Sequence, residues 1–369
     1  MKILYIVNVD WFFVSHRLPI AKKALSEGHE VHIATRFTNK QELLSKSGFV
    51  LHHIAIKRSD SNLFSFIKDI LNIIGLYLKI RPDLVHLITI KPVLIGLIAG
   101  FFNRRINYVA SISGLGHVFS AKTFKATVKR ALITLLYKIS FSHKNLKVIF
   151  QNKNDLRIIT EITSLPLHKT ILINGSGVDL NKYVPSSINL KKPVVLFAGR
   201  LLFSKGIKEF IEVSKKVKNA KFLIAGDIDP ENPESISYKN INKWSKLKNV
   251  IFLGHQEDMV KIIQESSIVV LPSYYGEGLP KILIEASACG IPVITTDHPG
   301  CRNAIIPGLT GLLVPIKDNL ALEKAIKTLL NNNDLRIKMG QESRKMAIDK
   351  FDINRVVDLH LTLYKSEFK

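Results

Sequence analysis

The stretch SIVVLPSYYGEGLPKILIEASACG, residues 267–290, decides the fold. Its opening residues are apolar and β-branched, which predicts a buried strand. Gly276 and Gly278 then mark a loop whose backbone can approach a ligand closely, and a helical apolar spacing runs from Pro280 to a stop at Gly290. The stretch therefore predicts strand, loop and helix in succession, which is the repeating unit of a parallel α/β sheet.

Two carboxylates, Glu277 and Glu285, lie eight residues apart on the two sides of this loop–helix junction. The backbone N–H groups and the positive dipole end at a helix start favour phosphate. A carboxylate further along the helix is suited to hydrogen-bonding hydroxyls. The pattern predicts a pocket for a nucleotide sugar, flanked by both carboxylates. Taken alone, a Glu pair at this spacing is more often a solvated helix face.

Further motifs follow in a fixed order around this stretch. They are VVLFAGRLLFSKGIKEFIE at 194–212, FLIAGD at 222–227, VIFLGHQEDMVKIIQESSIVVLPS at 250–273, GIPVITTDHPGCRNAI at 290–305 and GLTGLLVP at 308–315. Together with the EGLP loop they resemble the retaining glycosyltransferases of family 4, which have the two-domain GT-B fold. The resemblance is strongest to bacterial N-acetylgalactosaminyl- and hexosyltransferases that extend lipid-linked oligosaccharides. It is close over roughly residues 190–340 and looser elsewhere.

The resemblance implies a donor site for a UDP-sugar. Arg200 and Lys205 would hold the diphosphate, Glu285 the ribose hydroxyls and Glu277 the sugar near its reacting face. The full donor-binding set implied is Gly199, Arg200, Lys205, Gly278, Leu279, Pro280 and Glu285, and the catalytic set is Glu277, Arg200, Lys205 and His117.

The resemblance also implies that cations rather than a metal neutralise the departing diphosphate, so we expect no metal ligands and no cofactor. The GDIDP segment offers Asp227 and Asp229 in the spacing of a metal motif, but it follows a predicted strand as an ordinary loop does. Front-side attack, assisted by the leaving phosphate, is favoured over a double displacement with Glu277 as the nucleophile. The sequence does not decide between the two.

The acceptor site is expected in the N-terminal half. Where many relatives carry a Gly-Gly loop, NVDWFFVSHRLPIAKKALSEGHEV at residues 8–31 has a loop with aromatic and charged residues, as in relatives that use lipid-diphosphate acceptors. The alternative is that His16 and Arg17 only cap the first helix. A second glycine loop, SISGLGHVFS, contains His117 as a candidate base, displaced from the usual position directly after the strand. The predicted acceptor-binding residues are Ser15, His16, Arg17, Gly114 and Gly116.

Strand and helix signals alternate along all 369 residues, which fits an α/β protein of two domains. The GT-B resemblance implies two Rossmann-like domains facing across a cleft: an N-terminal acceptor domain at 1–180, a C-terminal nucleotide-sugar domain at 190–351, and a last helix at 352–369 that returns to the first domain. The apolar stretch at 84–102 has nearly the length of a membrane span, but Lys91 and Pro92 favour a strand, a loop and a buried helix.

The net charge of +23 and the isoelectric point near 9.8 require an acidic partner. No nucleic-acid-binding motif accompanies the charge, so we expect an anionic membrane surface. The basic, apolar segment at 121–147 is the candidate contact, with a domain-packing helix as the alternative. Two cysteines and no signal peptide fit a cytoplasmic protein, peripheral at the inner face of the plasma membrane.

The sequence thus predicts a retaining glycosyltransferase that moves a hexose or N-acetylhexosamine from a UDP-sugar to a polyprenyl-diphosphate-linked glycan in bacterial surface polysaccharide or glycan assembly. One rival keeps the fold with lipid A core or a soluble acceptor. The other is a basic nucleotide- or nucleic-acid-binding protein, which leaves Arg200, Lys205, Glu277 and Glu285 without a purpose.

Overall fold

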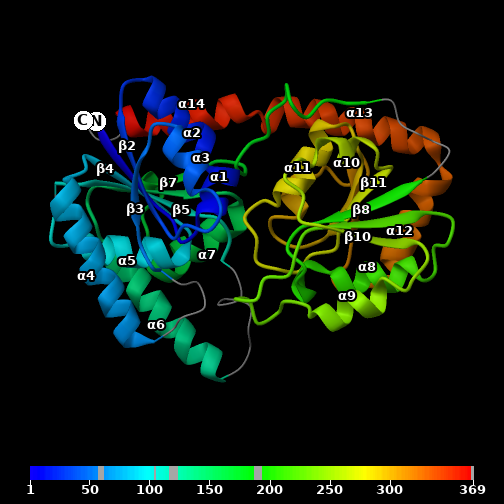
Figure 1. The fold of residues 1–369 in the computed structure, drawn as a ribbon, viewed down its shortest axis with the longest axis horizontal. Helices are drawn as coiled ribbons and strands as arrows, with labels where there is room; N and C mark the ends of the chain where they lie inside the picture. Colours follow the sequence, from blue (N-terminus) through cyan, green and yellow to red (C-terminus); the bar gives the residue numbers. More distant parts are fainter. Residues whose placement is uncertain (57–61, 104, 116–123, 187–192, 367–369) are drawn as a thin grey trace. The chain divides into compact units, whose positions relative to one another are not determined.

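A computed structural model describes residues 1–56, 62–103, 105–115, 124–186 and 193–366, with the side chains of 124–130 and 366 excepted (Figure 1). The chain divides into two compact units. Unit 1 comprises Met1–Ser176 and Asn354–Lys369, and unit 2 comprises Gly177–Ile353. Each unit has its own parallel sheet and its own apolar core, which confirms the predicted α/β class.

The sheet of unit 1 has the order β3-β2-β1-β4-β5-β6-β7, and every neighbouring pair is parallel. Its inner strands are nearly continuous apolar runs because helices cover both faces. The strands are β1 Lys2–Ile6, β2 Glu30–Thr35, β3 Val50–His53, β4 Leu84–Ile88, β5 Asn107–Ile112, β6 Leu146–Phe150 and β7 Thr170–Leu172.

Two layers of helices cover this sheet. Figure 1 shows α4, α5 and α6 on one face and α1, α2 and α14 on the other, as right-handed crossovers require. The last helix belongs to unit 1 through buried contacts, since Tyr364 on α14 hydrogen-bonds with His86 on β4 at 2.6 Å. The helices are α1 Asp10–His16, α2 Leu18–Ser26, α3 Gln41–Lys46, α4 Leu63–Ile80, α5 Ile90–Gly100, α6 Phe124–Ser140, α7 Lys153–Thr163 and α14 Ile353–Ser366.

Unit 2 has a six-stranded parallel sheet in the order β10-β9-β8-β11-β12-β13. The strands are β8 Val194–Ala198, β9 Lys221–Ala225, β10 Val250–Gly254, β11 Ile268–Leu271, β12 Val293–Thr296 and β13 Gly311–Val314. The helices are α8 Ile207–Ser214, α9 Tyr238–Trp244, α10 Val260–Gln264, α11 Lys281–Ala288, α12 Asn319–Asn331 and α13 Asn333–Lys350.

The strand order of unit 2 reverses between the central neighbours β8 and β11. One crossover leaves β8 toward β9, and the other leaves β11 toward β12, so the loops after these two strands diverge at the sheet's carboxyl edge. Ligands of open α/β sheets bind at such reversal points. The two loops are the ones that carry the predicted donor residues.

Three details of unit 1 differ from the sequence predictions. The expected loop around Asp10–His16 is helix α1, because its aromatic residues continue the helix and Asp10 opens it. Helix α5 begins at Ile90, so Lys91 and Pro92 lie in its first turn, where proline is tolerated, rather than in a loop. The segment expected to lead out of the first domain forms an additional strand, β7, beside β6.

The apolar stretch at 84–102 is divided between β4 and the buried helix α5, as the alternative to a membrane span predicted. Across the described ranges, no helix combines the length and the hydropathy that crossing a bilayer requires.

Candidate functional site: a cation and carboxylate cluster in unit 2

The loops after β8 and β11 are held in direct contact by a glycine. Gly206 has φ +81°, and a Cβ placed there would lie 2.3 Å from the carbonyl oxygen of Pro272. The backbone N–H of Tyr274 donates to the Ser204 carbonyl at 2.8 Å, which ties the loops a second time. Only glycine fits this approach, so the GRLLFSKG turn is shaped by its contact with the EGLP loop.

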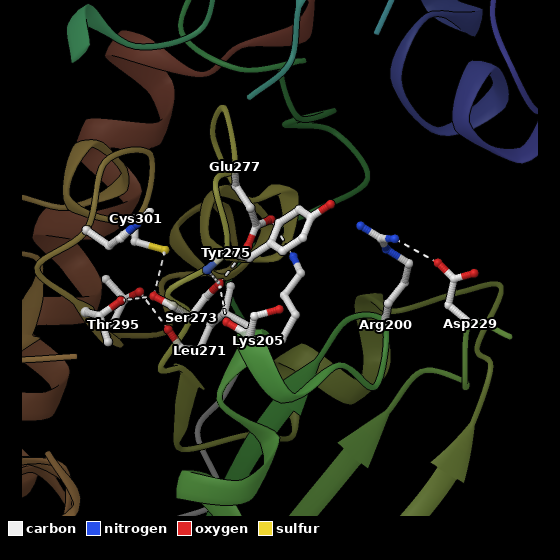
Figure 2. A network of polar contacts seen from close by, with 12 residues as sticks. Arg200, Lys205, Asp229, Leu271, Ser273, Tyr275, Glu277, Thr295 and Cys301 are labelled. Carbon is white, nitrogen blue, oxygen red and sulfur yellow. Dashed lines mark hydrogen bonds and ion pairs between the residues drawn. The ribbon is translucent and has the colours of Figure 1, made fainter. Parts of the chain in front are cut away.

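Lys205 and Glu277, from these two loops, form an ion pair in a nearly enclosed position (Figure 2). The side chain of Lys205 is buried, with 8% of the residue exposed. The second carboxylate oxygen of Glu277 accepts a hydrogen bond from Ser273 Oγ at 2.9 Å. Both oxygens of Glu277 are therefore engaged, and the Lys205 ammonium is held at the junction of the loops.

Arg200 lies beside this pair. Its Nη1 donates to Asp229 Oδ2 at 2.8 Å. The backbone N–H of Asp229 in turn donates to Ser235 Oγ at 2.8 Å. Burial lowers the pKa of Arg200, but Tyr275 and Asp229 outweigh burial and raise that pKa overall. The Tyr275 ring centre lies 5.5 Å from the Arg200 guanidinium and 5.9 Å from Lys205 Nζ. One aromatic ring thus faces both predicted diphosphate-binding cations.

The EGLP segment leads into α11 as predicted. Pro280 is the N-cap residue of α11 with extended backbone, and Leu279 is buried in the core of unit 2. Gly300, from the loop after β12, approaches this segment closely, because a Cβ there would lie 2.5 Å from the Glu277 carbonyl and 2.6 Å from that of Gly278. The loop after β12 thus packs closely against the backbone of Glu277 and Gly278, the segment predicted to bind a phosphate.

Glu285 is buried on α11 and has partners of its own. Its carboxylate lies 3.5 Å from Lys281 Nζ and hydrogen-bonds with the Tyr183 side chain. Burial raises the pKa of Glu285, opposed by Lys281 and Tyr183. Burial, together with Glu285, also raises the pKa of Tyr183, so its hydroxyl keeps its proton. The two carboxylates predicted to flank one pocket therefore have separate sets of contacts.

Three members of this site did not emerge from the sequence. Ser273 orients Glu277, Tyr275 faces both cations, and Tyr183 contacts Glu285. Ser273 and Tyr275 lie inside the quoted loop, so their proximity to Glu277 was a usable signal. Tyr183 comes from the segment before β8, and its spacing from Glu285 carries no comparable signal.

The predicted acceptor residues of unit 1 lie in different environments. Ser15 and His16 are partly exposed on α1, and the His16 ring stacks on Phe12 at 4.1 Å. Arg17 is only 1% exposed and donates to the His16 carbonyl at 2.9 Å. Gly114 has φ +107°, a conformation that favours glycine. Gly116 and His117 lie outside the described residues.

No three His, Cys, Asp or Glu side chains are grouped as potential metal ligands within the described ranges. The candidate Asp229 has Arg200 as its partner.

Two parallel-sheet α/β units, with two cations and a carboxylate at a sheet reversal point, fit a glycosyltransferase. Family models bear this out: "Glycosyl transferases group 1" matches residues 181–346, and "Glycosyl transferase 4-like" matches residues 2–152. The chain belongs to these glycosyltransferase families, with the GT-B fold.

Curated bacterial relatives match over most of their length. The chain is 28% identical, over all of both chains, to N,N'-diacetylbacillosaminyl-diphospho-undecaprenol alpha-1,3-N-acetylgalactosaminyltransferase of Campylobacter jejuni. It is 28% identical to the capsular polysaccharide biosynthesis glycosyltransferase CapM of Staphylococcus aureus, over 100% of this chain and 98% of that one. It is 26% identical to UDP-Gal:alpha-D-GlcNAc-diphosphoundecaprenol alpha-1,3-galactosyltransferase of Escherichia coli, over 81% and 80%.

Among solved structures, sucrose-phosphate synthase from Thermosynechococcus elongatus superposes with a TM-score of 0.82 at 20% identity, covering 100% of this chain and 99% of that chain. A likeness at this identity shows the fold. The predicted fold, family and enzyme class are therefore confirmed.

Proposed function

We propose that this glycosyltransferase moves a hexose or N-acetylhexosamine from a UDP-sugar, with retention of configuration, to a glycan carried on a polyprenyl diphosphate. The names of two relatives support the acceptor class, since both act on undecaprenol-diphosphate sugars. The name of the Escherichia coli relative supports a UDP-linked donor. The enzyme works at the anionic inner face of the plasma membrane, on the cytoplasmic side.

The observation that carries the proposal is the buried Lys205–Glu277 pair beside Arg200. In the proposed mechanism the donor diphosphate takes the place of Glu277 at Lys205 Nζ, and Arg200 holds a second phosphate oxygen through its fork of donors. Glu277 is then released toward the sugar, and Glu285 accepts hydrogen bonds from the ribose hydroxyls. These cations perform the neutralisation without a metal ion.

In the chemical step the bond between the anomeric carbon and the β-phosphate oxygen breaks, and its electron pair remains on that oxygen. The acceptor hydroxyl oxygen bonds to the same face of the anomeric carbon, and its proton passes to the departing phosphate. UDP and the extended lipid-linked glycan are the products. Lys205 and Arg200 stabilise the charge that grows on the diphosphate, an effect largest in the transition state.

Release of UDP tests the proposal. A panel of UDP-sugars is incubated with the enzyme, with and without an undecaprenyl-diphosphate glycan, in EDTA. We expect acceptor-dependent UDP release from one donor, and nuclear magnetic resonance of the product should show the anomeric configuration of the donor. Transfer only to lipid A core or to a water-soluble acceptor would overturn the acceptor assignment, and loss of release in EDTA would overturn the metal-independent mechanism.

A further inference from the structure

Helix α4 has an outward face whose apolar side chains are exposed in the described part of the chain. Ile73 and Tyr77 lie on its buried inner face, and the Tyr77 hydroxyl donates to the Gly96 carbonyl of α5 at 3.1 Å. Phe64, Leu71 and Leu78 on the opposite side are 77%, 62% and 63% exposed. Together with Ile67, they fall within about 60° of arc at 100° per residue and extend over about 21 Å of helix. A surface helix of a globular protein normally turns polar residues outward.

Helix α6 has a second exposed apolar stripe. It lies on the same face of the sheet, separated from α4 by the buried α5 (Figure 1). Among its described side chains, Leu132, Leu135 and Ile139 are exposed. The stripe on α4 and the stripe on α6 together are called the α4–α6 face. Exposed apolar side chains scattered singly need no explanation, but two apolar stripes on helices of one layer indicate a contact surface.

The charges on the α4–α6 face have one sign. Lys68 and Lys79 are exposed on α4, and Lys138 is exposed on α6. Asp69 is the only carboxylate in α4, and it is turned inward, 3.7 Å from Lys91. The described exposed residues of α4 and α6 thus include apolar side chains and lysines but no acid. Apolar stripes bordered by lysines complement the headgroups and acyl boundary of an anionic bilayer.

A second copy of the chain is a poorer occupant for this face. A two-fold interface would set the same patch against itself, so lysines would meet lysines with no carboxylate between them. We propose that the α4–α6 face docks on an anionic lipid surface, with Phe64, Leu71 and Leu78 inserted below the headgroups and Lys68, Lys79 and Lys138 beside the lipid phosphates. The proposal rests on the proposed membrane-borne acceptor, and it assigns that contact chiefly to α4, which the sequence prediction did not include.

Vesicle co-sedimentation of the full chain tests the proposal. Vesicles contain phosphatidylcholine alone or mixed with phosphatidylglycerol. We expect wild type to bind the mixed vesicles, and Leu71→Ser with Leu78→Ser to reduce the partition coefficient by roughly tenfold or more. The matched control on unit 2 is Leu320→Ser, which removes a side chain 70% exposed on α12 and should bind as wild type.

The electrostatic contribution has its own control. Lys68→Glu with Lys79→Glu should weaken binding to the mixed vesicles, and this loss should be smaller at high ionic strength. Lys324→Glu, at an exposed position on α12, changes the same kind of charge on unit 2 and should have little effect. Equal losses for both substitutions would mean that total charge, not this face, governs binding, and would overturn the proposal.

Insertion is measured directly with a fluorophore. Cys289 and Cys301 are buried, so an introduced Leu71→Cys can be labelled selectively with an environment-sensitive dye. Mixed vesicles should shift its emission to the blue, whereas a dye at Leu320→Cys should not respond. An unshifted dye on Leu71→Cys would overturn the proposal, as would a wild-type dimer, formed without vesicles, that Leu71→Ser dissociates.

The outcomes separate this proposal from the proposed function. Vesicle binding needs no turnover. If wild type binds vesicles through α4 but releases no UDP from any donor, only the proposed function is overturned. If wild type transfers sugar but the Leu71→Ser, Leu78→Ser variant binds vesicles as well as wild type does, only the docking proposal is overturned.

Discussion

Lys205 in unit 2 and Arg17 in unit 1 are both buried cations, but the protein pairs them differently. Lys205 contacts the carboxylate of Glu277, which Ser273 also holds. Arg17 donates to the His16 carbonyl, its Nε has no hydrogen-bond partner, and none of the described carboxylates pairs with it. Burial lowers the pKa of Arg17 to about 10, which still leaves it charged at neutral pH. The contrast separates a cation paired with a carboxylate from one enclosed without such a partner.

The difference matters energetically. Removing one partner of a buried ion pair leaves an uncompensated charge and costs about 3–5 kcal/mol, whereas removing a buried charge that has no ionic partner can be neutral or stabilising. If a ligand phosphate replaces Glu277 at Lys205, the ammonium still has an anionic partner, because one anion is exchanged for another. At Arg17 a ligand anion would first have to reach an enclosed side chain. The predicted role of Arg17 at the acceptor diphosphate stays a prediction.

The largest effect is expected for Lys205→Ala. Loss of the ammonium should lower kcat/KM for UDP-sugar by roughly 10²–10³, since removing one donor to developing negative charge has this magnitude. Steady-state UDP release measures it. The control is Lys215→Ala, which removes an exposed lysine paired with Glu212 in the same unit and should leave kcat/KM unchanged. A decrease below threefold for Lys205→Ala would place the diphosphate elsewhere.

The same contrast can be measured as stability. Lys205→Met leaves the partly buried Glu277 carboxylate without its cation and should reduce the free energy of unfolding by about 3 kcal/mol. Arg17→Met removes a buried charge without an ionic partner and should change it by less than about 1 kcal/mol, in either direction. Urea unfolding followed by circular dichroism measures both. Similar decreases in the free energy of unfolding for Lys205→Met and Arg17→Met would contradict the distinction between a paired and an unpaired buried cation.

Much of the fold followed from the sequence because parallel strands in a covered sheet are apolar runs that end at turns, as β1, β4 and β11 do. Arg200 and Lys205 were identified through the resemblance to family 4, and Glu277 through the loop–helix pattern around it. All three follow a central strand, and such positions meet at one sheet edge. Helix α1 was missed because a polar, aromatic segment after β1 resembles a loop. The environment of Arg17 could not be predicted, since Arg17 interacts with Tyr364 of α14, more than 300 residues away along the chain.

Acidification should affect unit 1 more than unit 2. Burial, with the nearby Arg17, lowers the pKa of His86 and lowers that of His360 to about 3. Both imidazoles are therefore neutral in the folded unit, and the unfolded chain takes up protons first. Their contribution to stability is present above about pH 6.5 and is lost as the pH falls toward the folded-state values. Between pH 7 and pH 5.5 we expect unit 1 to lose about 2 kcal/mol.

Unit 2 should respond with the opposite sign at Glu285. Burial raises the pKa of Glu285, so its contribution is present at acidic pH and is lost as the pH rises. The two tryptophans report on the units separately: Trp244→Phe leaves Trp11 in unit 1, and Trp11→Phe leaves Trp244 in unit 2. Urea midpoints from tryptophan fluorescence should fall further for Trp11 on acidification. Equal falls would show that the buried histidines do not set the acid sensitivity.

The smallest effect is expected at Tyr275, which faces both paired cations of unit 2. A ring at this distance contributes about 0.5–1 kcal/mol to each cation, so Tyr275→Leu should raise KM for the donor by roughly threefold to tenfold with little change in kcat. The neighbouring Tyr274 provides a matched control, because its ring faces Lys317 at 4.6 Å, outside the predicted site, and Tyr274→Leu should leave KM unchanged. A lower kcat at constant KM would instead assign Tyr275 to the transition state. Arg17 also has tyrosines nearby, Tyr5 and Tyr364. If Tyr275 affects donor binding in unit 2, a neighbouring tyrosine ring is therefore common to both cations and does not by itself distinguish a ligand-binding cation from an enclosed one.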